Sequence, residues 1–243
     1  TGSARVDTVE LPGGDPEATS VWTALMMSET YFVTGQAWGD FDDDGRPDLF
    51  LTDQDGPNRL FRNRGDGTFE RQVIFHSDNP GFGCSRIDVA DIDGDGDTDV
   101  LLVNGDSLDT PIAKPYHSLR WLENAGGFPF VDHEIARLPG AHCVRAGDLD
   151  GDGDLDLAAV SLLPGAALAE HPPGTFDSIA WFEQTSPGVF SGDSLERDNC
   201  RHAACALADW EADGDLDLIV ADLSPDPTAA QPLTIFRNRT IVD

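Results

Sequence analysis

Short apolar runs recur along the chain, and an acidic cluster stands directly before each of them. The runs are Leu49–Leu51, Val100–Val103, Leu157–Val160 and Leu218–Val220. Three or four apolar or β-branched residues between polar turns are typical of buried β-strands. The best helix candidate, Glu17–Ser28, lacks a clean helical period. The pattern therefore predicts an all-β chain.

An aromatic segment follows each apolar run, and in the first three copies a further strand-like segment follows it. The aromatic segments are Leu60–Asn63, Trp121–Asn124, Trp181–Gln184 and Ile235–Asn238; the further segments are Phe69–Phe75, Phe130–Ala136 and Phe190–Leu195. Each unit thus indicates four antiparallel strands, with the acidic cluster between the first and second. Repeats of this length and content predict propeller blades, here within one domain spanning residues 1–243.

The acidic cluster has the form Asp-x-Asp-x-Asp-Gly-x-x-Asp at residues 40–48, 91–99 and 148–156, and at 209–217 Glu211 replaces the second Asp. Calcium takes six to eight oxygen ligands, and short carboxylates at alternate positions of a tight turn converge on one point. The sixth-position glycine permits the positive φ that such a bend needs.

We expect side-chain ligands at positions one, three, five and nine and a backbone carbonyl at position seven, for up to four Ca²⁺ ions. The predicted ligands are Asp40, Asp42, Asp44, Arg46, Asp48, Asp91, Asp93, Asp95, Asp97, Asp99, Asp148, Asp150, Asp152, Asp154, Asp156, Asp209, Glu211, Asp213, Asp215 and Asp217.

An EF-hand starts in the same way but requires a bidentate acid at position twelve. Position twelve here is Leu51, Leu102, Ala159 or Val220, and strands rather than helices follow. A plain polar turn is the other reading of an Asp-Gly cluster. Four copies in the same context favour calcium loops.

These loops, the Asp-Leu strands after them and the Trp-x-Glu-Asn segment at Trp121–Asn124 resemble FG-GAP/VCBS repeats, the blades of integrin-α-like propellers. The resemblance covers nearly the whole chain and implies a calcium-binding β-propeller. The Phe-Gly and Gly-Ala-Pro pieces that name the family are not clearly present. Propellers of this family usually have about seven blades, whereas this chain has four loops.

The two ends of the chain predict how the array closes. The last unit stops after its aromatic strand, Thr234–Arg239, whereas Arg5–Leu11 alternates in polarity like Arg71–Phe75. The N-terminal strand can therefore complete the last blade and protect its edge. We expect a closed propeller of four blades, each with four antiparallel strands.

The charge of −30, with only 15 basic residues, argues against nucleic acid and anionic membranes as partners. No apolar stretch approaches the ~20 residues of a membrane span, and no signal peptide is visible in the sequence. Calcium loops suit an extracellular or periplasmic protein, because calcium is plentiful there.

The four cysteines allow disulfides in such a compartment. Cys84, Cys143 and Cys205 fall shortly before calcium loops, on or near the first strands, and Cys200 lies just before such a strand. Bridges between blades, or a local Cys200–Cys205 bridge, are feasible. Buried free thiols are the alternative, and the sequence leaves the pairing open.

The face opposite the calcium loops is expected to carry the binding function, because propellers generally bind through loops at one end. Insertions at Gly105–Ser118 and Leu163–Ser178 map to this face, and so do His76, His117, His142, His171 and His202. Loops that merely collect polar residues are one reading. A site for an anionic or sugar ligand, or a transition-metal site for Zn or Cu built with nearby cysteines, is the other.

Two functions follow from these observations. The first is a secreted, calcium-stabilised binding module for a glycan, protein or small molecule. The alternative is an enzyme, such as a polysaccharide lyase or a transition-metal-dependent enzyme, with His76, His142, His202 and Arg145 as candidate catalytic residues. Gly-x-Ser-x-Gly, phosphate-loop and His-Glu-x-x-His motifs are absent from the sequence, which favours the module. The aromatic segments are interpreted as blade core.

Removal of calcium tests the loops. EDTA is expected to lower the melting temperature markedly, because a ligand that binds only the folded state stabilises it, and because the acidic loops repel one another without the ion. Thermal unfolding with calcium and with EDTA measures the effect. Identical melting curves would contradict structural calcium.

Overall fold

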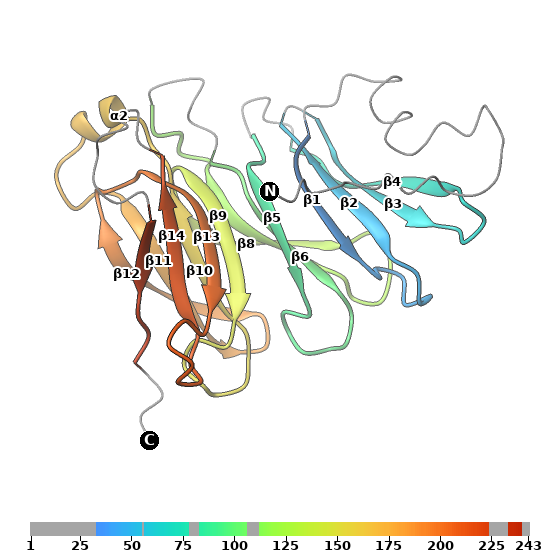
Figure 1. Ribbon diagram of the computed structural model, residues 1–243. Helices are drawn as coiled ribbons and strands as arrows, with labels where there is room; N and C mark the ends of the chain where they lie inside the picture. The colour runs from blue at the N-terminus through green and yellow to red at the C-terminus, as the bar shows by residue number, and fades with distance from the viewer. Residues whose placement is uncertain (1–32, 55, 78–82, 106–111, 224–232, 240–243) are drawn as a thin grey trace, which may run out of the picture.

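The structure is a computed structural model that describes residues 33–54, 56–77, 83–105, 112–223 and 233–239. The described residues form an all-β fold, as predicted, with four antiparallel sheets and one five-residue helix, α2 (Gly165–Ala169) (Figure 1). We number the sheets 1 to 4 in chain order.

Strands within each sheet lie in sequence order, joined by antiparallel pairing. Sheet 1 contains β1 (Val33–Gly39), β2 (Asp48–Asp53), β3 (Asn58–Asn63) and β4 (Phe69–Phe75); sheet 2 contains β5 (Arg86–Ala90), β6 (Asp99–Val103), β7 (Ser118–Glu123) and β8 (Val131–Arg137); sheet 3 contains β9 (Ala141–Gly147), β10 (Asp156–Ser161), β11 (Asp177–Ser186) and β12 (Val189–Arg197); sheet 4 contains β13 (His202–Ala208), β14 (Asp217–Asp222) and β15 (Leu233–Phe236).

The predicted apolar runs are the second strands of the sheets. Every residue of β2, β6 and β10 is buried, and each of these strands has a hydrogen-bonded neighbour on both edges. The fourth strands β4, β8 and β12 instead mix exposed and half-buried residues, as expected at a sheet edge. Burial therefore decreases from the inner strands of each sheet to its rim.

The sheets pack through their first strands. β1 contacts β5, β5 contacts β9, and β9 contacts β13, and Figure 1 shows these strands side by side through the middle of the molecule. Apolar clusters fill each junction. Phe41 and Phe50 belong to the cluster between sheets 1 and 2, Leu101 and Leu157 to the one between sheets 2 and 3, and Val220 to the one between sheets 3 and 4.

The acidic loops connect the first and second strand of every sheet, as predicted. They lie at one end of the strands, and α2 lies at the other end within the insertion at 163–178 (Figure 1). The strand that begins at each ninth-position Asp also agrees with the rejection of the EF-hand reading, in which a helix would follow.

Closure into a ring stays a prediction. The segment Arg5–Leu11, expected to complete the last sheet, lies outside the described residues, and the described part of sheet 4 has three strands. Within the described part of the chain, β1 and β13 are not packed together as the consecutive first strands are. The described sheets thus form a series of four with three junctions.

A side-chain amide crosses each of these junctions. A residue near the end of the third strand donates to the backbone oxygen at position two of the preceding sheet's acidic loop. Asn124 Nδ2 lies 3.0 Å from the Phe41 oxygen, and Gln184 Nε2 lies 3.0 Å from the Ile92 oxygen. Asn238 Nδ2 lies 2.6 Å from the Leu149 oxygen. We call this contact the junction amide.

Replacement of Gln184 tests the junction amide. Gln184→Leu removes the donor to two backbone oxygens, those of Ile92 and Leu155, and leaves both without it. The free energy of unfolding should fall by about 1–3 kcal/mol. Urea denaturation measures it, with Gln72→Leu on the half-buried position of β4 as the control, for which a change within about 0.5 kcal/mol is expected. Equal effects of the two substitutions would count against the junction amide.

Candidate metal centres and the opposite face

Three of the four acidic loops bring carboxylates together. Ligand atoms of three acids lie within 4.8 Å of one another in each of these loops, as a divalent cation requires. The groups are Asp40, Asp42 and Asp48; Asp91, Asp93 and Asp99; and Asp148, Asp150 and Asp152. The fourth loop, 209–217, although fully described, is not among the groups found in the described residues.

Backbone conformation confirms the reason for the sixth-position glycine. Its φ is +81° at Gly45, +102° at Gly96, +99° at Gly153 and +101° at Gly214. Position four is left-handed as well, and sequence reasoning missed it. The φ there is +53° at Asp43, +75° at Gly94, +82° at Gly151 and +60° at Ala212. The glycines at two of the four copies were the signal for a second sharp bend.

The first-position acid organises the turn through backbone hydrogen bonds. Asp40 accepts from the N–H groups of Asp44 and Gly45 at 3.1 and 2.7 Å, and Asp209 accepts from Asp213 and Gly214 at 3.0 and 3.2 Å. These bonds hold the loop curled around the carboxylates, so that the protein itself imposes much of the arrangement that a cation would use.

The ninth-position Asp is the most buried acid of each loop, with an exposed fraction of 0–1 % in all four copies, Asp48, Asp99, Asp156 and Asp217. One carboxylate oxygen accepts the N–H of loop position two at 3.0–3.2 Å. The other accepts the N–H of the residue at the end of the third strand at 2.7–2.8 Å. This Asp therefore ties the loop, the second strand and the third strand together.

Burial and crowding make the loop charges costly. Burial raises the pKa of Asp99 to about 6, even though its hydrogen bonds from Asn124 and Ile92 oppose the shift. The pKa of Asp154 and of Asp215, at position seven, is also raised to about 6 by desolvation and by the neighbouring aspartates. A cation among these groups would favour their ionised forms and remove this cost.

The four loops differ in one neighbouring charge. The residue before Asn63 in sheet 1 and before Asn238 in sheet 4 is Arg. Arg62 pairs with Asp42, and Arg237 lies 3.4 Å from Glu211. The same position is Glu123 in sheet 2 and Glu183 in sheet 3. The third-position acid is therefore partly neutralised in the first and fourth loops. In the second loop, Glu123 instead adds negative charge near Asp93 and helps to raise its pKa, after the larger effects of burial and Asp95.

The histidines of the opposite face are held in contacts within the fold. His202 is buried, and its two ring nitrogens lie 2.6 Å from carboxylate oxygens of Asp222 and Glu196. His142 Nδ1 lies 2.9 Å from the Ala203 oxygen. His117 is fully buried, with its Nδ1 accepting from the Gly140 N–H at 3.2 Å.

The remaining candidates of that face are spread over several elements. His76 is exposed after β4, and His171 lies after α2 with Nδ1 2.9 Å from the Ala167 oxygen. Arg145 donates to the Val144 oxygen at 2.7 Å and lies 4.0 Å from Asp88. The candidate catalytic residues are thus spread over three sheets: His76 follows β4, His142 and Arg145 are on β9, and His202 begins β13. Within the described ranges, the histidines and cysteines form no group of three metal-ligand atoms.

All four cysteines are buried free thiols in the structure, so the disulfides considered from the sequence are not formed in it. Cys84 accepts a hydrogen bond from Asn58 Nδ2 at 3.2 Å, and Cys200 lies 3.6 Å from the Ser178 hydroxyl. Cys143 and Cys205, on neighbouring first strands, face each other across the junction of sheets 3 and 4. In the part of the chain that the structure describes, no hydrogen bond joins Cys200 to Cys205.

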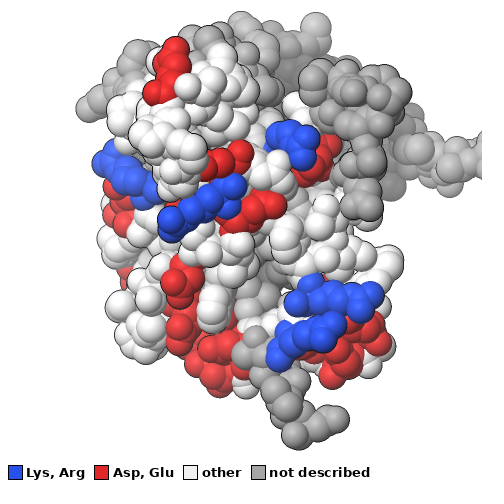
Figure 2. Space-filling view, turned by 90° about the vertical axis from the view of Figure 1, so that its left-hand side faces the viewer, with Lys and Arg blue, Asp and Glu red and all other residues white. Residues whose placement is uncertain are grey.

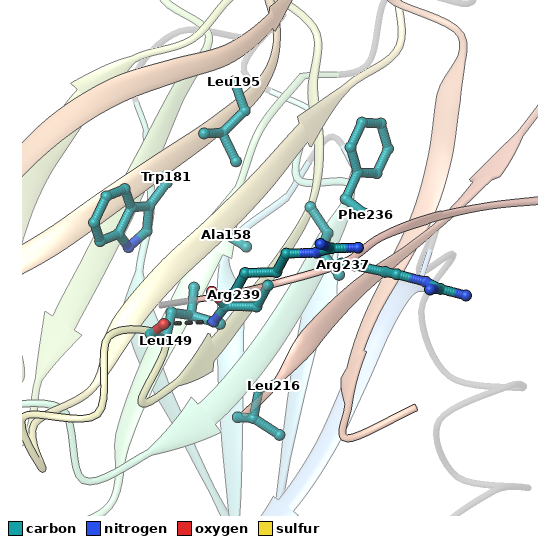
Figure 3. A pocket seen from close by; sticks show the side chains of 10 residues that line it. Leu149, Ala158, Trp181, Leu195, Leu216, Phe236, Arg237 and Arg239 are labelled. Carbon is teal, nitrogen blue, oxygen red and sulfur yellow. Dashed lines mark hydrogen bonds between the residues drawn. The ribbon is translucent and has the colours of Figure 1, made fainter. Parts of the chain in front are cut away.

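A cavity of about 250 Å³ opens between sheets 3 and 4. Figure 3 shows Trp181 and Leu195 on one side, Phe236 on the other, and the side chains of Arg237 and Arg239 beside the opening. A second cavity, of about 130 Å³, lies between the second and third acidic loops. Sequence reasoning pointed to the opposite end and missed both cavities. Each cavity is lined by residues of two sheets, and the sequence of one strand does not predict how two sheets pack.

Charge on the outer side of sheets 3 and 4 is mixed. Figure 2 shows basic side chains there in small groups, each next to acidic ones. Ion pairs of sheets 3 and 4 include Arg197–Asp177, Arg201–Asp222 and Arg237–Glu211, at 3.1, 3.7 and 3.4 Å. This side therefore offers no continuous basic surface to a phosphate backbone.

Comparison with known proteins agrees with the loops and strands. Residues 40–102, which span the first two acidic loops and the sheet strands between them, match the family model of the FG-GAP-like repeat. Residues 40–102 carry an FG-GAP-like repeat. This match confirms the resemblance drawn from the loop motifs, and it places the repeat across the junction of sheets 1 and 2.

Relatives extend the similarity beyond the matched repeat. The chain is 27 % identical to cartilage acidic protein 1 of Xenopus tropicalis over 212 residues, which cover 84 % of this chain and 30 % of that protein. It is 28 % identical to the Homo sapiens protein of the same name over 197 residues, 78 % of this chain and 28 % of that protein. The chain thus spans less than a third of these relatives. In the described residues, no helix is long and apolar enough to cross a membrane.

Substitution within the fourth loop separates the scaffold role from the metal role. Asp217→Asn keeps one acceptor oxygen but turns an NH₂ group toward the N–H of Trp210 or Asn238. Its free energy of unfolding should fall by about 1–3 kcal/mol already in EDTA, where no cation takes part. Urea denaturation, run in EDTA and in calcium, measures this.

Asp213→Asn is the matched control for Asp217→Asn. Asp213 raises the pKa of Asp215 through its side-chain hydrogen bond and its charge. Its neutralisation relieves repulsion, so stability in EDTA should not fall, whereas the gain on adding calcium should shrink. An Asp217→Asn protein as stable as the unsubstituted protein in EDTA would overturn the scaffold role.

Proposed function

We propose that the chain is a calcium-stabilised binding module. The observation that carries this proposal is the repeated gathering of three carboxylates in loops of a chain with an FG-GAP-like repeat. Each group lies where the first strand of a sheet turns into the second. Calcium there replaces the repulsion between acids with attraction and fixes the ends of the inner strands.

The neighbouring charges set an order among the sites. Carboxylates that already pair with Arg must give up that pair or share it with the cation, and each additional nearby acid strengthens cation binding. The second loop, beside Glu123, and the third, which has Glu183 at the equivalent sequence position, are therefore the tighter calcium sites. The first and fourth, beside Arg62 and Arg237, are the weaker ones.

The sheets are proposed to be blades of a closed four-bladed propeller, with Arg5–Leu11 completing the last blade. Support comes from the equivalence of the four strand–loop–strand units and from the three junctions that pack first strand against first strand. An extracellular or periplasmic location is proposed as well, since loops of this kind need plentiful calcium. The relatives carry cartilage in their name, in keeping with this proposal.

The ligand-binding face is proposed to be the one opposite the calcium loops, which bears α2, the long insertions and exposed polar residues such as His76 and Arg201. A glycan, a protein or a small molecule is the proposed class of ligand, with no role for nucleic acid and no insertion into a membrane. The enzyme alternative stays a hypothesis. The contacts of His142, His202 and Arg145 within the fold give it no specific support.

Calorimetric titration of the calcium-free protein tests the order of the sites. We expect binding in at least two classes, with the tighter class lost in Glu123→Gln combined with Glu183→Gln. Arg62→Gln should instead strengthen a weak site, because it removes the cation that pairs with Asp42. Failure of any calcium to bind at millimolar concentration, the weak end for extracellular modules, would exclude the proposed function.

A glycan array probed with the calcium-loaded protein tests the binding face. A hit that Arg201→Ala weakens, while Arg64→Ala leaves it unchanged, supports the opposite face. Arg64 is the matched control because it is equally exposed but lies in the turn beside the first calcium loop. The reverse result would place binding at the calcium-loop end, and conversion of the bound glycan into products would favour the enzyme.

A further inference from the structure

The thiols of Cys143 and Cys205 stand apart from the other two cysteines because they meet across two sheets. Cys143 is on β9 and Cys205 on β13, the first strands of sheets 3 and 4. The sulfur of Cys143 accepts the backbone N–H of Cys205 at 3.1 Å, and its thiol lies 3.5 Å from the Cys205 oxygen. Both side chains belong to the apolar cluster that fills the junction of sheets 3 and 4.

This geometry brings both side chains within reach of a covalent bond. The backbone nitrogen of Cys205 that touches the Cys143 sulfur is only two bonds from the Cβ atom of Cys205. Disulfides need Cβ atoms about 3.5–4.5 Å apart on strands whose side chains face each other. The Cys143 sulfur already contacts both the backbone N–H and the backbone oxygen of Cys205 across the junction, so the two side chains come close to that arrangement.

The surroundings also make the pair more reactive than an ordinary buried thiol. Interaction with the Cys205 side chain, followed by the charges of Arg145 and Arg86, lowers the pKa of Cys143 to about 7 despite its burial. The same interaction raises the pKa of Cys205. Cys143 is therefore the thiol of the pair that ionises first. Burial instead raises the pKa of Cys84 to about 12 and that of Cys200 to about 11.

We propose that Cys143 and Cys205 form a disulfide that joins sheets 3 and 4 when the chain folds in an oxidising compartment. The oxidant is a disulfide of low molecular weight, such as oxidised glutathione. The Cys143 thiolate attacks one of its sulfur atoms and releases one glutathione thiolate. The Cys205 thiol then loses its proton to solvent and attacks the Cys143 sulfur, which releases the second glutathione. Two protein thiols are oxidised and one small disulfide is reduced.

The burial of both sulfur atoms determines when this exchange takes place. Cys143 has no exposed area and Cys205 only 5 %. Glutathione therefore reaches the pair while the junction of sheets 3 and 4 is still open during folding, and the closed junction afterwards protects the bond from reduction. The bond closes a loop across a sequence separation of 62 residues, long enough for a large effect on the unfolded chain.

Refolding of the full chain with calcium in a mixture of reduced and oxidised glutathione tests the proposal. The product is denatured, alkylated and measured by mass spectrometry. We expect two alkylated thiols, those of Cys84 and Cys200, and one linked peptide pair containing Cys143 and Cys205. Four alkylated thiols, or a linked Cys200–Cys205 pair, would overturn the proposal.

Thermal unfolding supplies a second readout that does not depend on peptide mapping. The oxidised protein should melt about 5 °C or more above the reduced protein, as expected for a disulfide that closes a long loop. Cys143→Ala should abolish the difference between oxidised and reduced samples, whereas the matched control Cys84→Ala should retain it. Loss of the difference in the control as well, or its persistence in Cys143→Ala, would show that another bond is responsible.

Discussion

A buried carboxylate that accepts two backbone N–H groups organises every repeat of this chain. The ninth-position Asp starts the second strand, holds the beginning of the acidic loop with one oxygen and holds the end of the third strand with the other. A neutral side chain of similar size has too few acceptors for both donors. The acid is therefore needed even where calcium contributes nothing, and the negative charge that the loops concentrate follows from this need.

The same few atoms connect one sheet to the next. The residue whose N–H reaches the ninth-position Asp also supplies the junction amide, so its backbone serves its own sheet and its side chain serves the neighbour. Calcium, the sheet and the junction are thus parts of one structure at this end of the molecule. If the first acidic loop loses its order, the next sheet is affected through two hydrogen bonds of Asn124, one to the Phe41 oxygen and one to Asp99.

Much of this fold can be predicted from the sequence because its determinants are local. Apolar runs specify the buried second strands, and Gly45 and its equivalents specify the bend. What sequence reasoning missed depends on contacts between sheets: the junction amide of Gln184 bonds to Ile92, 92 positions away. The cavity beside Trp181 also depends on how two sheets sit together.

The histidines show the limit of placing residues on a face from strand order alone. They do lie toward the predicted end, but a shared end does not bring side chains together. The His202 ring contacts the carboxylates of Asp222 and Glu196. The His117 ring accepts the backbone N–H of Gly140. The free thiols likewise could not be paired by spacing, since Cys143 finds Cys205 only through the stacking of two first strands.

The residue at loop position two behaves differently in the last sheet. Phe41 and Ile92 each have 1 % of their area exposed beneath the following sheet, whereas Trp210 has 58 % exposed. Each junction covers this residue of the preceding unit, fully at Phe41 and Ile92 and partly at Leu149, so an open row of n units gains n − 1 such contacts and a ring gains n. The stability of a repeat chain of this kind therefore depends on whether its two end faces meet as well as on how many units it contains. The exposed indole of Trp210 lies on the end face that closure of a ring would cover.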